Sequence, residues 1–277
     1  NDSASTILVP HWQVPGARLE ADLFNVTLDG QPVEYLGILV KRPAPTPADY
    51  VSIGPGKSLT GRTELSRHYD MASGGEYLIS YRTDLSVGNR PGELAAATEA
   101  DASAAVAIWR DAPVRAPVDW EAINAIPAPE GLSFTNCSSS QQSGVTTAVN
   151  GAKTYSTGAK NYLLGKTYST VGPRYTSWFG AKNSSRFNTT KSHYTSIENA
   201  FLTKPVVVDC GCTDDYYAYV YPTQPYKIYV CNAFWSAPAT GTDSKAGTLV
   251  HEMSHFNAVA GTDDWAYGQT ACKSLAT

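Results

Sequence analysis

The chain has 277 residues, and its 21 Lys and Arg against 25 Asp and Glu give a formal net charge of −4. This charge argues against nucleic acid as a partner, because surfaces that bind nucleic acid are basic. No run of eighteen apolar residues occurs, so the sequence predicts no membrane span, and its length suffices for two domains.

Residues 1–112 have the pattern of an all-β domain. Short apolar stretches, some of them alternating with polar residues, are separated by Gly and Pro, which is typical of strands in a sandwich. The dipeptide Asp29-Gly30 is a favoured hairpin turn. We therefore expect an Ig-like β-sandwich, with candidate strands at 19–28, 35–41, 50–53 and 76–82.

Residues 113–134 are rich in proline and predict an extended linker. Extended, accessible connections of this kind are preferred sites of proteolytic cleavage, so we expect maturation here. No Lys lies between Lys57 and Lys153, so a lysine-directed protease would not be the one that cuts in the linker.

From residue 135 onward the pattern changes to mixed helix and strand. Apolar residues at helical spacing predict one helix after Ser138 and another around Phe187 to Phe201. His193, in the second helix, is interpreted as structural. Three short strands are then expected, and the third is our candidate for the sheet edge that binds an extended substrate. They span 206–210, 216–220 and 226–231, and we expect a small antiparallel sheet.

The motif His251-Glu252-Met253-Ser254-His255 indicates a metal site. On a helix, which we expect to begin after Asp243 or Ser244, the two histidines stack on one face and can share a divalent cation, usually zinc. Glu252 is then placed to act as general base toward a water at the metal.

A catalytic zinc commonly has three protein ligands, so a third is needed. No Glu or His follows His255, which leaves Asp263, Asp264 and Cys272 as downstream candidates. Gly261 is expected to end the motif helix. A new helix capped by Thr262 or Asp263 would place Asp264 and Tyr267 on one face.

The motif helix and the following segment 261–268, Gly-Thr-Asp-Asp-Trp-Ala-Tyr-Gly, together resemble the deuterolysin (aspzincin) family of zinc endopeptidases. Residues 135–277 are most similar to the fungal peptidyl-lysine metalloendopeptidases. The stretches that carry this resemblance are 136–140 (NCSSS), 174–180 (RYTSWFG), 233–238 (AFWSAP) and 241–245 (GTDSK).

The resemblance implies that His251, His255 and Asp264 bind zinc. It also implies that Glu252 is the base and that Tyr267 stabilises the transition state. Asp263 stands at a variable position of the family pattern and is left out of the ligand set.

Five cysteines indicate an oxidising compartment, and the Cys210-Gly-Cys212 spacing is too tight for an ordinary zinc knuckle. The resemblance implies two disulfides, Cys137–Cys210 and Cys212–Cys231, with Cys272 unpaired.

These observations predict two domains: the β-sandwich of residues 1–112, which resembles a propeptide, and an α+β zincin-like endopeptidase domain at 135–277. We expect a secreted proenzyme that hydrolyses protein or peptide substrates with Zn²⁺ and whose prodomain contacts the catalytic domain in cis. Cleavage before Lys is implied by the resemblance alone. In the lysine-specific relatives, a segment beyond the position of Thr277 carries the acidic residues that hold the substrate lysine. The alternative is a catalytically inactive relative that serves as a binding or toxin-like protein.

Overall fold

The computed structural model describes residues 1–82, 104–111 and 131–276, and these form two compact units. The first unit comprises Asn1–Ile38 and Pro45–Ile126, and the second comprises Leu39–Ala44 and Pro127–Thr277. The short segment Leu39–Ala44 thus belongs to the C-terminal unit, although it lies far upstream in the sequence. The predicted linker lies largely outside the described residues, so its boundaries stay a prediction.

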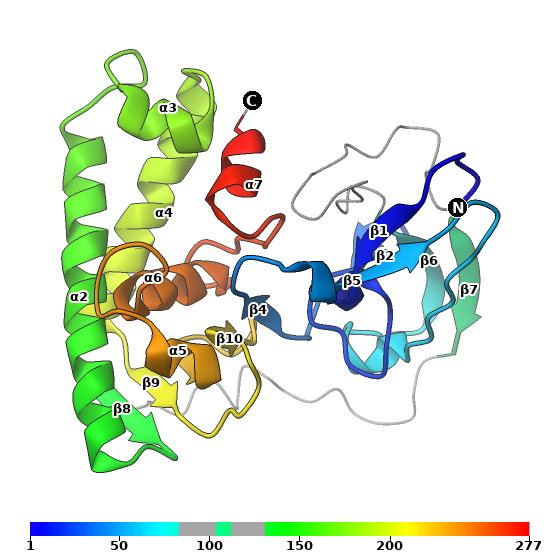
Figure 1. Ribbon diagram of the computed structural model, residues 1–277, viewed down its shortest axis with the longest axis horizontal. Coiled ribbons are helices and arrows are strands. Elements are labelled where there is room, and N and C mark those ends of the chain that lie inside the picture. The colour runs from blue at the N-terminus through cyan, green and yellow to red at the C-terminus, as the bar shows by residue number, and fades with distance from the viewer. Residues whose placement is uncertain (83–103, 112–130, 277) are drawn as a thin grey trace. The chain divides into compact units, whose positions relative to one another are not determined.

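The N-terminal unit is built from antiparallel strands, as expected (Figure 1). Asp29 and Gly30 both have positive φ, 48° and 80°, so the predicted hairpin turn forms at this dipeptide. An Ig-like sandwich stays a prediction. The unit has a two-stranded sheet of β1 (Ile7–Pro10) and β5 (Tyr50–Ile53), and a four-stranded sheet in the order β3 (Gln31–Pro32), β2 (Phe24–Leu28), β6 (Gly75–Tyr81) and β7 (Val106–Arg110). Three 3₁₀ turns, η1 to η3, span His11–Gln13, Pro47–Asp49 and Leu65–Arg67.

A small apolar cluster holds this unit together. Tyr77 is fully buried, and the Tyr69 hydroxyl donates a hydrogen bond to Asp22 at 2.5 Å. Burial raises the pKa of Asp22, although this hydrogen bond and the Arg82 guanidinium oppose the rise. The buried members of the cluster are Leu19, Leu23, Val26, Tyr69, Met71 and Tyr77.

The sheet of the C-terminal unit has five strands, and its topology corrects two expectations. Its order is β4 (Leu39–Lys41), β10 (Ala218–Val220), β11 (Lys227–Val230), β9 (Val206–Asp209) and β8 (Leu132–Thr135). The sheet is mixed rather than antiparallel, because β9 runs parallel to both of its neighbours, β11 and β8, whereas β10 is antiparallel to β4 and β11. The expected edge strand, β11, is interior, and the upstream strand β4 forms the edge beside β10.

Three helices pack together in this unit, α2 (Ser139–Leu164), α4 (Ser184–Thr203) and α6 (Lys245–His255), and both predicted long helices are confirmed (Figure 1). Ser138 begins α2 through a reciprocal capping box with Gln141. Gly151 on α2 allows the close approach of α6, because a Cβ there would lie 2.8 Å from the Cβ of Ala246. Shorter helices are α3 (Pro173–Phe179), α5 (Asn232–Ser236) and α7 (Gln269–Ser274).

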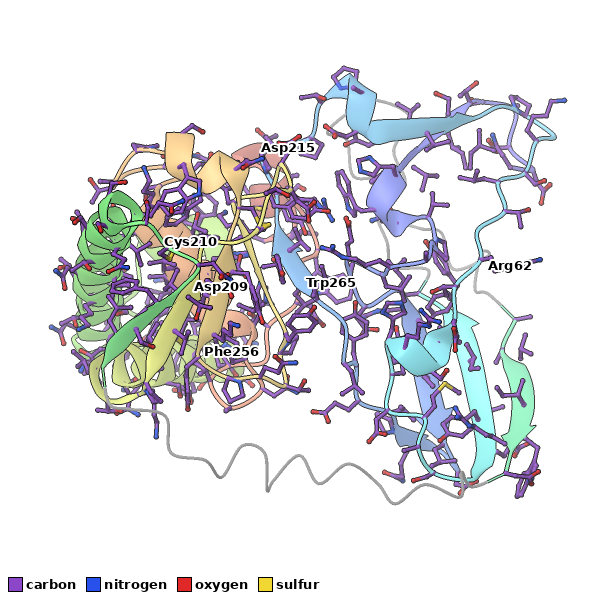
Figure 2. All side chains as sticks on the ribbon, turned by 90° about the horizontal axis from the view of Figure 1, so that it is seen from below. Arg62, Asp209, Cys210, Asp215, Phe256 and Trp265 are labelled. Atoms are coloured by element: carbon purple, nitrogen blue, oxygen red, sulfur yellow. A yellow bond between two sulfur atoms is a disulfide. The ribbon has the colours of Figure 1, made fainter. Side chains whose placement is uncertain are left out.

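Both predicted disulfides are present, Cys137–Cys210 and Cys212–Cys231, and Cys272 is a free cysteine. Asp209, at the end of β9, directly precedes Cys210 of the first disulfide (Figure 2). Its carboxylate accepts hydrogen bonds from Asn136 and from the Gly211 amide. Among the described residues, no helix combines the length and apolar character that crossing a membrane requires.

Candidate metal centre and active site

The helix α6 carries the His-Glu-x-x-His motif, and its start confirms the sequence expectation. The Ser244 side chain caps it by accepting a hydrogen bond from the Gly247 amide at 3.1 Å. Leu249 and Met253 are fully buried in the apolar core of the unit. The packing of this face fixes the orientation of the helix, so that His251 and His255 project together from another face.

The chain leaves the helix at Phe256, five residues before Gly261, which corrects the predicted helix end. Phe256 is fully buried, and its carbonyl oxygen accepts hydrogen bonds from the amides of Val259, Ala260 and Gly261 at 2.8, 3.0 and 3.1 Å. Gly261 does adopt the expected left-handed conformation, with φ of 56°. The turn wraps around one carbonyl group instead of extending the helix.

The segment that follows is irregular, so the predicted second helix over Asp264 and Tyr267 is wrong; α7 begins only at Gln269. Thr262 ties the segment back to α6 instead. Its amide donates to the Ser254 carbonyl oxygen at 3.1 Å, and the hydroxyls of Thr262 and Ser254 are 2.7 Å apart. This pairing brings Asp264 back over the two histidines.

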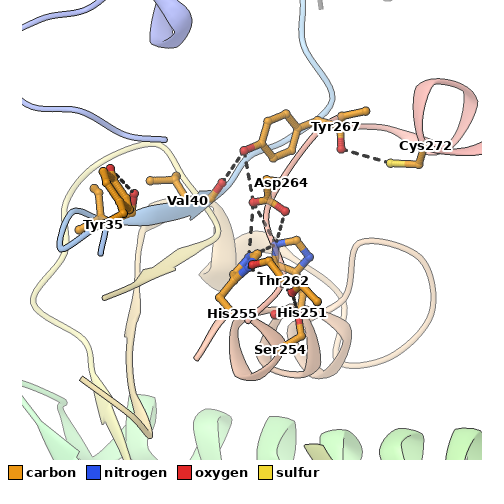
Figure 3. Close-up of polar contacts among 11 residues, drawn as sticks. Tyr35, Val40, His251, Ser254, His255, Thr262, Asp264, Tyr267 and Cys272 are labelled. Carbon is orange, nitrogen blue, oxygen red and sulfur yellow. Dashed lines mark hydrogen bonds and ion pairs between the residues drawn. The ribbon is translucent and has the colours of Figure 1, made fainter. Parts of the chain in front are cut away.

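His251, His255 and Asp264 converge on one point (Figure 3). One ligand atom from each residue lies within 4.8 Å of the other two. The Nε2 atoms of the histidines are 3.0 Å apart. The Asp264 carboxylate lies 3.2 Å from His251 Nε2 and 3.5 Å from His255 Nε2. Two ligands of one tetrahedral zinc, with bonds of about 2.0–2.1 Å, lie about 3.3 Å apart, so this spacing fits zinc.

The hydrogen bond at the far side of His255 fixes which nitrogen faces the cluster. His255 Nδ1 lies 2.5 Å from the Thr262 carbonyl oxygen, to which it donates its proton. The lone pair of the neutral ring is then on Nε2, toward His251 and Asp264. This is the arrangement that orients a metal-binding histidine.

The electrostatics of the three residues are those of a cation site. Burial alone would raise the pKa of Asp264, but His251 and His255 hold it well below the usual range. Burial would lower the pKa of His255, and Asp264 raises it instead, to about 9. The Asp264 carboxylate thus stabilises a positive charge at a buried position, and a divalent ion there would interact with it more strongly than a single proton does.

Glu252 is a fully buried carboxyl group directly beside this cluster. Burial raises its pKa to about 8. Neither carboxyl oxygen has a hydrogen-bond partner of ordinary geometry among the described residues. A buried polar group without a protein partner indicates a missing water or ion. A water held at the metal would satisfy this need.

Tyr267 completes the arrangement from the irregular segment. Its hydroxyl donates a hydrogen bond to the Val40 carbonyl oxygen at 2.8 Å and lies 3.3 Å from Asp264 Oδ2. Burial raises the pKa of Tyr267 well above its ordinary value, and the charge of Asp264 adds to the effect. The phenol is therefore a neutral hydrogen-bond donor at neutral pH.

The other candidate residues lie outside the cluster. Asp263 is exposed, and the Cys272 thiol donates to the Ala266 carbonyl oxygen at 3.2 Å. His193, whose structural role stays a prediction, lines a cleft of about 460 Å³ together with His251. No local pattern indicates this position, because His193 precedes the motif by more than fifty residues and comes near it through the packing of α4 against α6.

The chain is similar to several known proteins. Residues 165–277 match the aspzincin family M35, described as "Lysine-specific metallo-endopeptidase". An "Extracellular protease" from Aeromonas hydrophila is 43% identical over 100% of this chain and 80% of its own length. A "Peptidyl-Lys metalloendopeptidase" from Grifola frondosa is 36% identical over 94% of this chain and 75% of its own length.

Shorter matches cover about half of the chain. A "Peptidyl-Lys metalloendopeptidase" from Pleurotus ostreatus is 44% identical over 52% of this chain and 84% of its own length. A solved structure of a zinc peptidase from Grifola frondosa is 50% identical, covers 51% of this chain and 85% of that chain, and has a TM-score of 0.48. With its motif and with relatives matched over 75–80% of their own lengths, this chain belongs to the aspzincin family of zinc metalloendopeptidases.

Proposed function

We propose that this chain is the proenzyme of a secreted zinc endopeptidase that cuts peptide bonds on the N-terminal side of lysine. The observation that carries the proposal is the convergence of His251, His255 and Asp264 beside the buried Glu252. Zinc suits the site because its two imidazoles and one carboxylate form a common donor set for catalytic zinc, leaving one position open.

Each residue of the site has a defined role in this proposal. His251, His255 and Asp264 hold the ion, and Thr262 orients one of the rings through its carbonyl oxygen. Zinc bound there would polarise the scissile carbonyl and lower the pKa of a water. Glu252 is placed to remove a proton from the attacking water and to pass it to the leaving amine. Tyr267 donates its hydroxyl hydrogen to the carbonyl oxygen as negative charge develops there.

The preference for lysine is supported by the family description and by the names of related proteins, and not by the geometry of the site. The family description and the relatives from Grifola frondosa and Pleurotus ostreatus all specify lysine. Secretion is supported by the Aeromonas hydrophila relative, named an extracellular protease, and by the two disulfides, which suit an oxidising compartment.

The proenzyme form is supported by the lengths of the relatives. The Pleurotus ostreatus enzyme matches only 52% of this chain yet is matched over 84% of its own length. A chain about three-fifths as long as this one therefore carries the same kind of name. The described residues of the N-terminal unit include no metal cluster. In this proposal the unit is a prodomain that is removed by proteolysis.

Cleavage mapping tests the proposal. The full chain, and the same chain after proteolysis within 113–134, are loaded with zinc and given a denatured protein substrate, and new N-termini are identified by mass spectrometry. We expect lysine at those new N-termini, loss of cleavage with a zinc chelator, and recovery when zinc is returned. A protein that binds zinc but cuts nothing in either form would favour the inactive binding or toxin-like alternative. Cleavage without lysine at the new N-terminus would refute the specificity alone.

A further inference from the structure

The strand β4 is an edge strand of the catalytic sheet. It runs antiparallel to β10, with Lys41 opposite Ala218 and Val40 opposite Tyr219. The Tyr217 amide extends the pairing by donating to the Lys41 carbonyl oxygen at 3.1 Å. Adding a strand to an exposed sheet edge is a general mode of peptide binding. Without β4, β10 would be that exposed edge.

One peptide bond of β4 contacts a side chain that the proposed mechanism uses. The Val40 carbonyl oxygen accepts the Tyr267 hydrogen bond at 2.8 Å (Figure 3). The strand β4 also packs against α6, the helix that carries Glu252. A scissile bond needs a hydrogen-bond donor at its carbonyl oxygen, and the Val40–Lys41 bond has one in Tyr267.

The residue after this bond is a lysine, in a family described as lysine-specific. Lysine is rare in this part of the chain, because Lys41 and Lys57 are the only two before residue 135. The Lys41 ammonium lies 5.6 Å from the centre of the Tyr217 ring. Val40 is 1% exposed, so the bond is enclosed rather than resting on the surface.

We propose that β4 is an internal substrate mimic: it fills the substrate groove along β10, with Val40–Lys41 at the position of the scissile bond. This inference rests on the proposed function, because it takes the groove along β10 to be the substrate-binding site of an endopeptidase. Because the segment is part of the same chain, it competes with any external peptide at a high effective concentration. Full-length protein is therefore self-inhibited until β4 leaves the groove.

Peptide binding without hydrolysis tests the proposal. The probe is a fluorescently labelled peptide with the sequence of residues 37–44, and the host is the full chain with Glu252→Gln, zinc-loaded. Binding is followed by fluorescence anisotropy. Lys41→Ala removes the side-chain anchor of β4, and Val40→Pro disrupts its backbone pairing. Lys57→Ala is the matched control, because Lys57 is exposed and belongs to the N-terminal unit.

We expect Lys41→Ala and Val40→Pro each to tighten probe binding about tenfold or more, because each raises the fraction of molecules with an open groove. Lys57→Ala should leave the affinity unchanged. Zinc content and melting temperature identify any variant that has failed to fold. Unchanged affinity in both folded β4 variants would overturn the proposal.

Peptide hydrolysis by the processed wild-type protein is measured separately. It distinguishes a failure of the proposed catalytic function from a failure of the internal substrate mimic. If that protein hydrolyses lysine peptides while the β4 variants bind the probe no better, only the internal substrate mimic is wrong. If no form hydrolyses any peptide while the β4 variants do bind more tightly, the groove and its occupant stand and the catalytic proposal fails.

Discussion

The hydroxyl of Tyr267 donates a hydrogen bond to the backbone carbonyl oxygen of Val40 at 2.8 Å, across 227 positions of sequence. Beside it, Asp264 Oδ2 lies 3.3 Å from the same hydroxyl. The phenol therefore already contacts a peptide carbonyl oxygen next to the carboxylate that is proposed to bind the metal. This is the contact that transition-state stabilisation would strengthen.

Replacing Tyr267 by Phe removes this donor and keeps the ring. We expect kcat on a lysine peptide to fall about 10²- to 10³-fold, as when one oxyanion donor is lost, with KM changed by only a few-fold. Zinc content should stay at the wild-type level. Tyr168→Phe, at an exposed tyrosine, is the control. A Tyr267→Phe enzyme with wild-type kcat would assign oxyanion stabilisation to another group.

Replacing Glu252 by Gln keeps the shape of the side chain and removes its basicity. Because Glu252 is not a proposed ligand, we expect full zinc occupancy together with a loss of most activity, about 10²-fold or more. Glu76→Gln, at an exposed position of the N-terminal unit, should have wild-type activity. Steady-state kinetics and metal analysis on the same samples check this, and near-wild-type hydrolysis by Glu252→Gln would refute the general-base role.

The ion pair between Lys160 and Glu198 connects α2 to α4 and should make stability depend on pH. The hydrogen bond from Lys160 lowers the pKa of Glu198 below its ordinary value of 4.5. A carboxyl group whose pKa is lowered by folding stabilises the protein when the pH is above the pKa of the unfolded state. This stabilisation is lost as the pH falls through the pKa of the folded state.

We therefore expect Glu198→Gln to reduce the free energy of unfolding by about 1–2 kcal/mol at pH 7, with a smaller difference from wild type below pH 4.5. Urea denaturation at both pH values measures it. A destabilisation that is equal at the two pH values would show that the loss comes from packing and not from the charge of Glu198.

Local patterns in the sequence predicted local structure well. The Ser244 cap, the Asp29-Gly30 turn and the two long helices are specified by residues within a few positions of one another. The disulfide pairing, in contrast, came from the family resemblance, because spacing alone does not determine which cysteines meet.

The errors share one physical cause, which is that tertiary contacts overrode the preferences of neighbouring residues. A second helix after Gly261 was compatible with the local residues, but hydrogen bonds from Thr262 to Ser254 hold that segment against α6. The edge of the catalytic sheet was assigned to β11, because nothing near that strand indicates that Leu39–Lys41 joins the same sheet beside β10. The position of His193 at the cleft could not be predicted for the same reason.

The zinc content of Asp264→Ala tests the central claim most directly, with Asp263→Ala as the neighbouring control. Asp264 lies within 3.5 Å of both histidine Nε2 atoms, whereas Asp263 is exposed outside the cluster. After dialysis against buffer with trace zinc, elemental analysis should find about one zinc per chain in wild type and in Asp263→Ala, and little in Asp264→Ala. Full zinc occupancy in Asp264→Ala would contradict the three-ligand site on which the account depends.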